Sequence, residues 1–297
     1  MTEPSATELL DQATAWWSTG ITDITPGRIA MRGYEIQDLI GTVTFPEMIW
    51  LMLRGDLPTR EQGALLEAAL VSAVDHGPQA PVISVARMAV TCGLPVNGAM
   101  ASAINVLDDV HGGAGQQCME LYSEIDAVMT PEGAPFLDPG DLDDATDMVI
   151  SRWRARGVKY FPGFGHRFHP VDPRVARLLA LVDAASADGV VSGRFATISR
   201  SVASSLSIGR SREVPMNVDG VTAVVYSELG FAPELGRGIF VLSRSVGVLA
   251  HAWEQMQQGG RIKGPMPPSI PYTYSGPAHR EVPDMQGYRS AAGASGR

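Results

Sequence analysis

The sequence predicts a mainly α-helical protein that has short β-strands only near its N-terminus. Three observations support this fold class. Apolar residues recur at helical spacing in most segments, a helix-capping pattern begins one of them, and the alternation typical of strands occurs in one segment. With 45% apolar and 19% charged residues in a chain of 297, the composition is that of a globular protein with a substantial core.

The N-terminal elements differ from the rest of the chain. The first 15 residues predict a helix with Leu9, Leu10 and Ala13 on one face. The segment GITDITPGRIAMRGY (20–34) then alternates apolar and polar residues around Pro26 and Gly27, which indicates a small β-hairpin.

Helices are predicted for most of the remainder. The segment 58–77 opens with Thr59 and Gln62 in capping-box spacing, and Leu66, Leu70 and Val74 recur at every fourth position. Further helices are expected within 81–93, 97–110, 172–186, 196–209, 217–230 and 236–256. Polar breaks are expected at 130–145 and from residue 259, and the last ~20 residues are predicted to be loose.

Composition also excludes several classes of function. No apolar run approaches the ~18–20 residues of a membrane span, and the N-terminus lacks the features of a signal peptide. The two cysteines, Cys92 and Cys118, are typical of a reduced cytoplasmic protein. The formal charge of −9 without a basic cluster disfavours a nucleic-acid partner.

His111 precedes two glycines and then a helical run. Near a helix N-terminus the positive end of the dipole lowers a histidine pKa, so a neutral imidazole is favoured. Such a ring can donate one hydrogen bond to a developing oxyanion. The alternative is a structural histidine before a turn.

The segment FPGFGHRFHPVDPR (161–174) places His166 directly after Gly163 and Gly165, which permit tight turns or close approach of a ligand. His166 and His169 are three residues apart, but neither a glutamate in the zinc-protease pattern nor a nearby cysteine accompanies them. No metal site is therefore predicted, and His169 is expected to pack or cap.

Asp219 lies at the start of a predicted helix, where an aspartate often acts as the cap. Asn217 can serve as the cap instead, which leaves Asp219 available. Two histidines on glycine turns and an aspartate at a helix start are a combination suited to acid–base work on a carbon acid.

Six ordered motifs together resemble those of citrate synthases and the related citryl-CoA lyases. They are ITDITPGRIAMRGYEIQDL (21–39), DHG (75–77), HGGAG (111–115), PGFGHRFHPVDPR (162–174), MNVDG (216–220) and LSRSVGVLAHAWEQ (242–255). The resemblance implies a citrate-synthase-like fold of two helical domains, with 1–112 and 222–297 in a large domain and 113–221 in a small mobile one. The active site would lie in the cleft between them, and the protein would be a homodimer.

The resemblance also implies catalytic roles. Asp219 would take a proton from the methyl carbon of an acyl-CoA thioester such as acetyl-CoA. His111 would hydrogen-bond the thioester oxygen, and His166 the carbonyl of a 2-oxo acid such as oxaloacetate. A fixed donor at such an oxygen typically gives about 100- to 1,000-fold in rate.

Substrate contacts are implied in the same way. Arg174 and Arg244 would bind substrate carboxylates, and the backbone of Gly163, Phe164 and Gly165 would lie against coenzyme A. Coenzyme A would enter as a thioester substrate, and no tightly bound cofactor is expected.

Three departures from the family pattern concern the substrate. Ala73 stands where citrate synthases commonly have a further histidine. Gly264 and Met266 stand where the family has arginines that reach a substrate carboxylate across the dimer. The loop from His166 to Arg174 is one residue shorter than usual.

Several details resemble citryl-CoA lyases and the lyase portion of ATP-citrate lyase, including DHGP (75–78), NVDG (217–220), GIFVLSRSVG (238–247) and Asp109. His111, in contrast, is retained here and often absent from those modules. The sequence thus predicts Claisen or retro-Claisen chemistry without separating citrate formation from citryl-CoA cleavage. A different acyl-CoA and 2-oxo acid pair, or a non-catalytic CoA-binding member of the family, are the alternatives.

Overall fold

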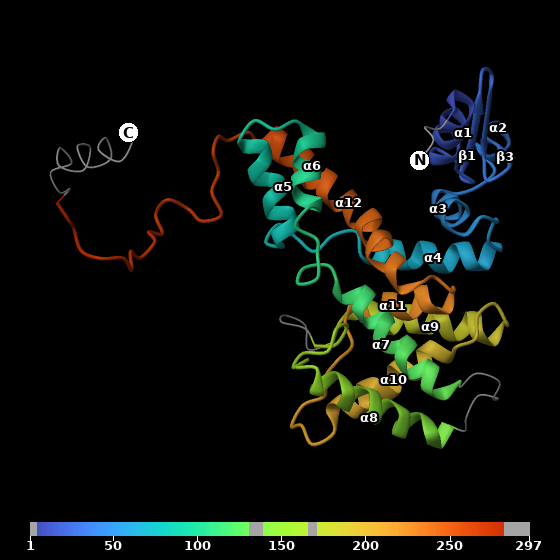
Figure 1. Cartoon of the computed structure of the whole chain (residues 1–297). Helices are drawn as coiled ribbons and strands as arrows, with labels where there is room; N and C mark the ends of the chain where they lie inside the picture. Colours follow the sequence, from blue (N-terminus) through green and yellow to red (C-terminus); the bar gives the residue numbers. More distant parts are fainter. Residues whose placement is uncertain (1–4, 131–138, 166–170, 282–297) are drawn as a thin grey trace, which may run out of the picture. The chain divides into compact units, whose positions relative to one another are not determined.

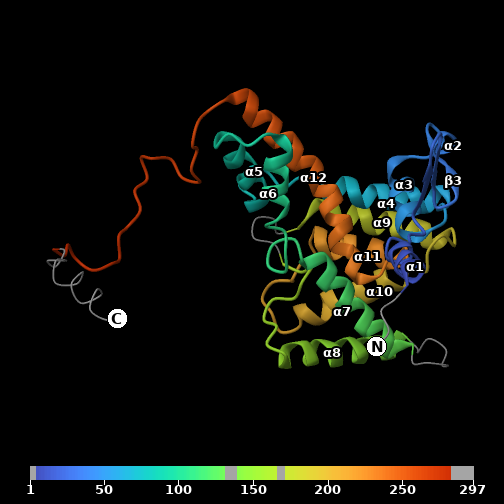
Figure 2. The ribbon, with the colours of Figure 1, turned by 45° about the horizontal axis from the view of Figure 1, so that its top comes forward.

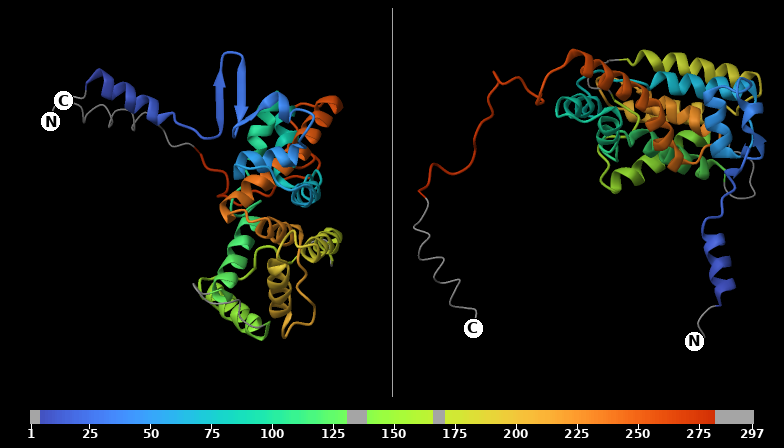
Figure 3. Two further views of the ribbon diagram at one scale, coloured as in Figure 1. Left: turned by 90° about the vertical axis from the view of Figure 1, so that its right-hand side faces the viewer. Right: turned by 90° about the horizontal axis from the view of Figure 1, so that it is seen from above.

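The computed structural model describes residues 5–130, 139–165 and 171–281. Helix α1 (Ala6–Trp16) precedes a three-stranded antiparallel sheet of β1 (Thr22–Thr25), β2 (Arg28–Met31) and β3 (Tyr34–Glu35), in the order β1-β2-β3. Thr22 pairs with Met31 and Thr25 with Arg28, so the turn falls at residues 26–27. Figure 3 shows the hairpin as two paired arrows. The predicted hairpin is confirmed.

All further elements of the described chain, up to residue 258, are helices (Figure 1). In order, the helices are α2 (Ile36–Leu39), α3 (Phe45–Arg54), α4 (Arg60–Ser72), α5 (Pro81–Thr91), α6 (Val96–Ile104), α7 (Ala114–Met129), α8 (Pro139–Ala155), α9 (Pro173–Ala187), α10 (Arg194–Ser207), α11 (Val218–Glu228) and α12 (Pro233–Gln258). The mainly α-helical fold class is therefore confirmed.

Helix α4 begins at the predicted capping box. The backbone N–H of Gln62 donates to Thr59 Oγ1 over 3.2 Å, and the N–H of Thr59 donates to Gln62 Oε1 over 2.9 Å. Leu66 and Leu70 are buried as expected. The helix ends at Ser72, however, so Val74 lies beyond it.

The polar break expected at 130–145 is wrong from Pro139 onward, because α8 begins there. Asp141 lies in its first turn, where a negative charge is favourable near the positive end of the helix dipole. Leu142, Ala145 and Val149 follow at helical spacing and are buried in the core. Their periodicity outweighs the proline, glycine and aspartate content that suggested a break.

Buried side chains form two clusters. The larger one draws on α3, α4 and α7–α11, and the smaller one on α5, α6 and α12. Helix α12 packs against α4, α5, α6 and α7, and Figure 2 shows it running past these helices. The division into domains 1–112 with 222–297 and 113–221 stays a prediction.

Helix α12 also caps the C-terminal end of α4, whose last carbonyls lack intrahelical partners. Ser243 Oγ donates to the carbonyl of Leu70, Arg244 Nε to that of Ala73 over 2.9 Å, and the N–H of Gly247 to that of Val74 over 3.1 Å. A Cβ at Gly247 would lie 2.2 Å from the Val74 carbonyl oxygen, so the close approach requires glycine. This contact places Arg244 beside the end of α4.

After α12, residues 259–281 contain no helix or strand, and residues from 263 onward form a unit separate from residues 1–262. The prediction of a loose end for residues 282–297 lies outside the described part of the chain. Among the helices that the structure describes, none is long and apolar enough to cross a membrane.

Candidate active site

Asp219 lies in the first turn of α11, and a neighbouring residue performs the capping. Asn217 Oδ1 accepts hydrogen bonds from the N–H groups of Asp219 at 3.0 Å and Gly220 at 3.2 Å. The expectation that Asn217 caps the helix and leaves the Asp219 side chain available is confirmed. Burial raises the pKa of the Asp219 carboxyl above its ordinary value, although Arg244 and Arg174 act against this. A carboxylate with a raised pKa is a stronger base.

His111 is held by a helix other than the one that follows it. Its Nε2 accepts the backbone N–H of Val82, in the first turn of α5, over 3.3 Å. In a neutral imidazole the other nitrogen then carries the proton, so Nδ1 is the donor. Burial and the charge of Arg244 lower the pKa of His111. The expected neutral ring is thus favoured by burial, by the positive charge of Arg244 and by the N–H group of α5 that Nε2 accepts.

Arg244 connects these two residues electrostatically. Only 4% of its surface is exposed, its Nε donates to the Ala73 carbonyl, and its guanidinium lies 4.9 Å from the centre of the Phe240 ring. Its charge lowers the pKa of both His111 and Asp219. A buried cation beside an ionisable base and a neutral imidazole suits a substrate that is an anion.

Arg174 lies at the start of α9 and is bound by Asp172, its N-cap residue. Arg174 Nε and Nη2 donate to the two carboxylate oxygens of Asp172 over 2.8 and 2.7 Å. Nη1 donates to the carbonyl of Ser72 over 3.3 Å. The charge of Arg174 also acts on Asp219, so these residues belong to one electrostatic environment.

The glycine segment packs against the start of α11. Gly163 O accepts the N–H of Asn217 over 3.0 Å, and the N–H of Gly165 donates to the Pro215 carbonyl over 2.7 Å. A Cβ at Gly163 would lie 2.7 Å from Gly220 Cα. Gly163 is therefore needed for contact between two backbones, while Phe164 is buried with its ring edge-on to Tyr122.

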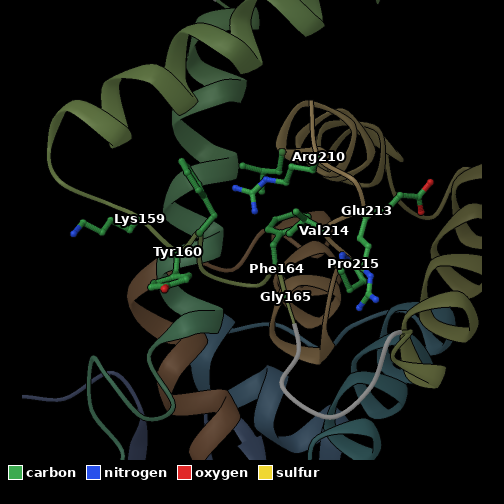
Figure 4. Close-up of a pocket in the computed structure, with 11 residues that line it drawn as sticks. Lys159, Tyr160, Phe164, Gly165, Arg210, Glu213, Val214 and Pro215 are labelled. Atoms are coloured by element: carbon green, nitrogen blue, oxygen red, sulfur yellow. The ribbon is translucent and has the colours of Figure 1, made fainter. Parts of the chain in front are cut away.

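A cavity of about 310 Å³ opens beside this segment. Phe164 and Gly165 line it together with Lys159, Tyr160, Arg210 and the 212–215 segment. Figure 4 shows Arg210 above Phe164, with Lys159 and Tyr160 to one side and Glu213 to the other. Three basic side chains, Lys159, Arg210 and Arg212, line the cavity together with one acidic one, Glu213, so its lining carries net positive charge.

The structure thus brings His111, Asp219, Arg174 and Arg244 close enough for Arg244 to act electrostatically on each of the other three. His166 and His169 lie outside the described residues, and Gly264 and Met266 belong to the separate C-terminal unit. No group of three potential metal ligands occurs among the residues that the structure describes.

Sequence reasoning missed Asp172 and the basic side chains of the cavity. Asp172 precedes a proline at the first helical position, a pattern typical of a helix cap, and nothing local indicates that it also binds α11. Lys159, Arg210 and Arg212 come from two segments about fifty residues apart, and only folding brings them together.

This arrangement can perform proton transfer at a carbon acid. Asp219 is a base with a raised pKa, His111 is a neutral hydrogen-bond donor, and two arginines supply positive charge for an anionic substrate.

Comparisons with known proteins agree with this chemistry. Residues 10–73 and 62–266 match the family model described as citrate synthase, C-terminal domain. The citrate synthase of Haloferax volcanii is 31% identical over 71% of this chain and 52% of its own length. The chain spans about half the length of the curated relatives it matches.

Solved structures extend the comparison. The citryl-CoA lyase of Hydrogenobacter thermophilus is 29% identical with a TM-score of 0.76, over 90% of this chain and 97% of that one. The ATP citrate lyase of Methanothrix soehngenii, solved with citrate and coenzyme A, is 18% identical with a TM-score of 0.70, over 93% of this chain and 45% of that one. At that identity the second likeness concerns the fold alone.

Proposed function

Because the chain belongs to the citrate synthase family, we propose that it catalyses carbon–carbon bond chemistry between acetyl-CoA and oxaloacetate, in the direction of citryl-CoA cleavage. The match over 97% of a citryl-CoA lyase chain supports this direction. Citrate synthesis is the second candidate, supported by the 31% identity to a citrate synthase.

In cleavage, citryl-CoA loses its hydroxyl proton, and the bond to the acetyl carbon breaks. Oxaloacetate and the enolate of acetyl-CoA form, and the enolate carbon takes a proton to become the methyl group. We assign to His166 the role of accepting the hydroxyl proton. Asp219 is assigned the role of donating the proton that the enolate carbon takes up. In condensation the same groups act in reverse, because a catalyst serves both directions.

His111 acts on the thioester oxygen. Its Nε2 already accepts the N–H of Val82, so the Nδ1 proton is the one available to the enolate oxygen. A neutral donor in a partly buried site is already oriented when charge develops on that oxygen.

Arg244 and Arg174 are proposed to bind the carboxylates of the oxaloacetate part. Arg244 is buried beside Asp219, and Arg174 is held by Asp172 on one edge of its guanidinium. A charge-assisted hydrogen bond from either residue contributes about 1.5–3 kcal/mol.

Coenzyme A is proposed to occupy the cavity beside Phe164 and Gly165. Three basic side chains against the single Glu213 suit its phosphate groups, and the exposed ring of Tyr160 is a surface on which adenine can stack. The 161–165 segment then leads from this cavity to the start of α11, where Asp219 lies.

One observation carries the proposal: Arg244 is buried and fixed by the Ala73 carbonyl, at a place where its charge acts on both Asp219 and His111. The experiment measures oxaloacetate release from citryl-CoA beside CoA release from acetyl-CoA plus oxaloacetate. We expect Asp219→Asn to lower turnover by orders of magnitude and to retain CoA binding, and the exposed Asp38→Asn to change neither. Unchanged turnover in Asp219→Asn would remove Asp219 as the base.

The two assays also separate the candidates. Activity with citryl-CoA alone excludes the synthase. CoA binding without turnover in either assay would indicate the non-catalytic family member instead.

A different substrate pair has its own supporting observation. Ala73, where citrate synthases commonly have a histidine, is fully buried, and its carbonyl accepts Arg244 Nε. Its methyl group offers no hydrogen bond to a 2-oxo acid. A panel of acyl-CoA and 2-oxo acid pairs tests this, and a pair that exceeds acetyl-CoA with oxaloacetate in kcat/KM would replace them.

A second copy of the chain is the proposed partner. Leu242, Val246, Leu249, Trp253 and Met256 follow one another at alternating spacings of four and three along α12, and each is 43–57% exposed. This spacing is typical of a seam between two helices. Sedimentation analysis should show a dimer that dissociates in the double variant Val246→Asp with Trp253→Asp. A monomeric wild-type protein would contradict it.

A further inference from the structure

We propose that Asp172 is a positioning residue that holds Asp219 and Arg174 in fixed relation to each other. The inference rests on the proposed function, since it gives these two residues their roles as base and carboxylate-binding group. Asp172 itself touches neither substrate nor the reacting atoms in this assignment.

The contacts of Asp172 carry the inference. Its carboxylate is fully buried, with 0% of its surface exposed. Oδ1 accepts the backbone N–H of Arg174 over 3.1 Å and Arg174 Nε over 2.8 Å. Oδ2 accepts Arg174 Nη2 over 2.7 Å and the backbone N–H of Val218 over 3.1 Å. Each oxygen therefore holds one donor on the arginine side chain and one on a helix backbone.

The hydrogen bond to Val218 gives the first N–H group of α11 an acceptor. The first N–H groups of a helix have no intrahelical acceptor. Asn217 takes those of Asp219 and Gly220, and Asp172 takes that of Val218, 46 positions away in the sequence. The residue immediately before the base is thus tied to the start of α9.

The bonds to Arg174 leave part of its guanidinium available. Of the five N–H groups, Nε and one each of Nη1 and Nη2 are used, toward Asp172 and Ser72. Two have no acceptor among the described residues and are proposed to bind a substrate carboxylate. Because the planar group is held on one edge, the direction of the remaining donors is set before substrate binds.

Asp172 also acts on the base through its charge. Its carboxylate raises the pKa of Asp219, whereas Arg244 from α12 and Arg174 from α9 lower it. Among the described residues, the charge of Asp219 also acts on Cys118 on α7 and Tyr226 on α11. Burial keeps both groups neutral with raised pKa values.

A purely structural role as the cap of α9 makes a different prediction. If Asp172 served only as that cap, its replacement would lower the stability of the protein and thereby its turnover. The pH at which Asp219 titrates would not change. The pH dependence therefore separates the two roles.

The test compares Asp172→Asn with Asp183→Asn. Asp183 on α9 also pairs with an arginine, Arg200 on α10, but Asp183 is exposed and has no contact with Arg174 or α11 among those described. In Asp172→Asn the amide NH₂ replaces one acceptor oxygen and faces the N–H donors that this oxygen held, so these hydrogen bonds are broken. The negative charge is lost as well. We expect kcat/KM to fall on the order of 100-fold, the loss typical of small misplacement of reacting groups, and KM for the dicarboxylate to rise.

The pH profile should move as well. Removal of a neighbouring negative charge lowers the pKa of Asp219. Asp219 must be ionised for condensation and protonated for cleavage, so it controls the acid limb of the pH–rate profile in condensation and the alkaline limb in cleavage. That limb therefore shifts to lower pH in Asp172→Asn and stays in place in Asp183→Asn. A folded Asp172→Asn protein with an unmoved limb overturns the inference. Asp172→Ser, which keeps a hydroxyl cap for α9, serves as the second variant.

Failure of the proposed function is distinguishable. If the wild type turns over neither substrate set, carbon-13 NMR titration of the Asp219 carboxyl and calorimetry with oxaloacetate decide the inference. We expect a lower Asp219 pKa and weaker oxaloacetate binding in Asp172→Asn. Wild-type values for both would overturn it.

Discussion

A single methyl group added at Gly163 should destabilise the protein by about 2–5 kcal/mol. The backbone of Gly163 has φ 79°, in the left-handed region, where a side chain costs about 1–2 kcal/mol. The new Cβ would also lie 2.6 Å from Cys118 Sγ and 2.7 Å from Gly220 Cα. Gly220 Cα is backbone of α11 and cannot swing aside, and the Cys118 side chain on α7 is fully buried in the core. Such overpacking costs about 1–3 kcal/mol.

Gly165 supplies a matched control. Its φ is 86°, but a Cβ there would meet no atom of the described residues within 4 Å. Gly165→Ala therefore carries only the backbone cost of about 1–2 kcal/mol. Urea unfolding of both variants should give a difference of about 1–3 kcal/mol in the free energy of unfolding, the share that overpacking adds at Gly163.

Two further results bear on the same contact. Because Gly220 directly follows Asp219, Gly163→Ala should also lower kcat more than Gly165→Ala does. Adding Cys118→Ala should recover part of the stability, since the Gly220 contact remains. Equal stability of the two alanine variants would refute the close packing of these backbones.

Three other predictions concern charged groups. Because burial raises the pKa of Asp219, the protonated carboxyl contributes stability below the unfolded pKa, and this contribution is lost as pH rises through the folded pKa. Asp219→Asn cannot ionise, so its Tm should not show this loss. The Tm of Asp219→Asn should therefore exceed that of the wild type at neutral pH. Arg244→Met removes a charge that lowers the Asp219 pKa, so the Asp219 limb of the pH–rate profile should move to higher pH, opposite to Asp172→Asn; a shift to lower pH would contradict the assignment. Glu228 accepts hydrogen bonds from Ser192 Oγ and three N–H groups at the start of α10, so urea unfolding of Glu228→Gln should show a loss of about 1.5–3 kcal/mol, against little change for the exposed Glu234→Gln.

Local signals were predictable because their partners are close in the sequence. The capping box of Thr59 and Gln62 spans three residues, and the hairpin turns at residues 26–27. The capping of α11 by Asn217, which leaves the Asp219 side chain available, depends on a hydrogen bond between residues two positions apart in the sequence. Such patterns act within one turn or one hairpin, so the chain order alone reveals them.

The start of α8 shows where composition misleads. Proline, glycine and aspartates near residue 140 are typical of a loop and equally typical of the first turn of a helix. Burial of Leu142, Ala145 and Val149 against the core decides between the two, and burial depends on the rest of the fold.

The sequence by itself determined the helical fold class and the hairpin, and its ordered motifs predicted which residues form the site. Only the tertiary structure decided how those residues are held: His111 by Val82 of α5, Arg244 by the end of α4, and Asp219 and Arg174 through Asp172. The physical reason is distance along the chain. Periodicity and capping are local, whereas the bonds from His111 to Val82, from Arg244 to Ala73 and from Asp172 to Val218 join positions 29 to 171 apart. The burial that shifts the pKa values exists only once the helices have packed.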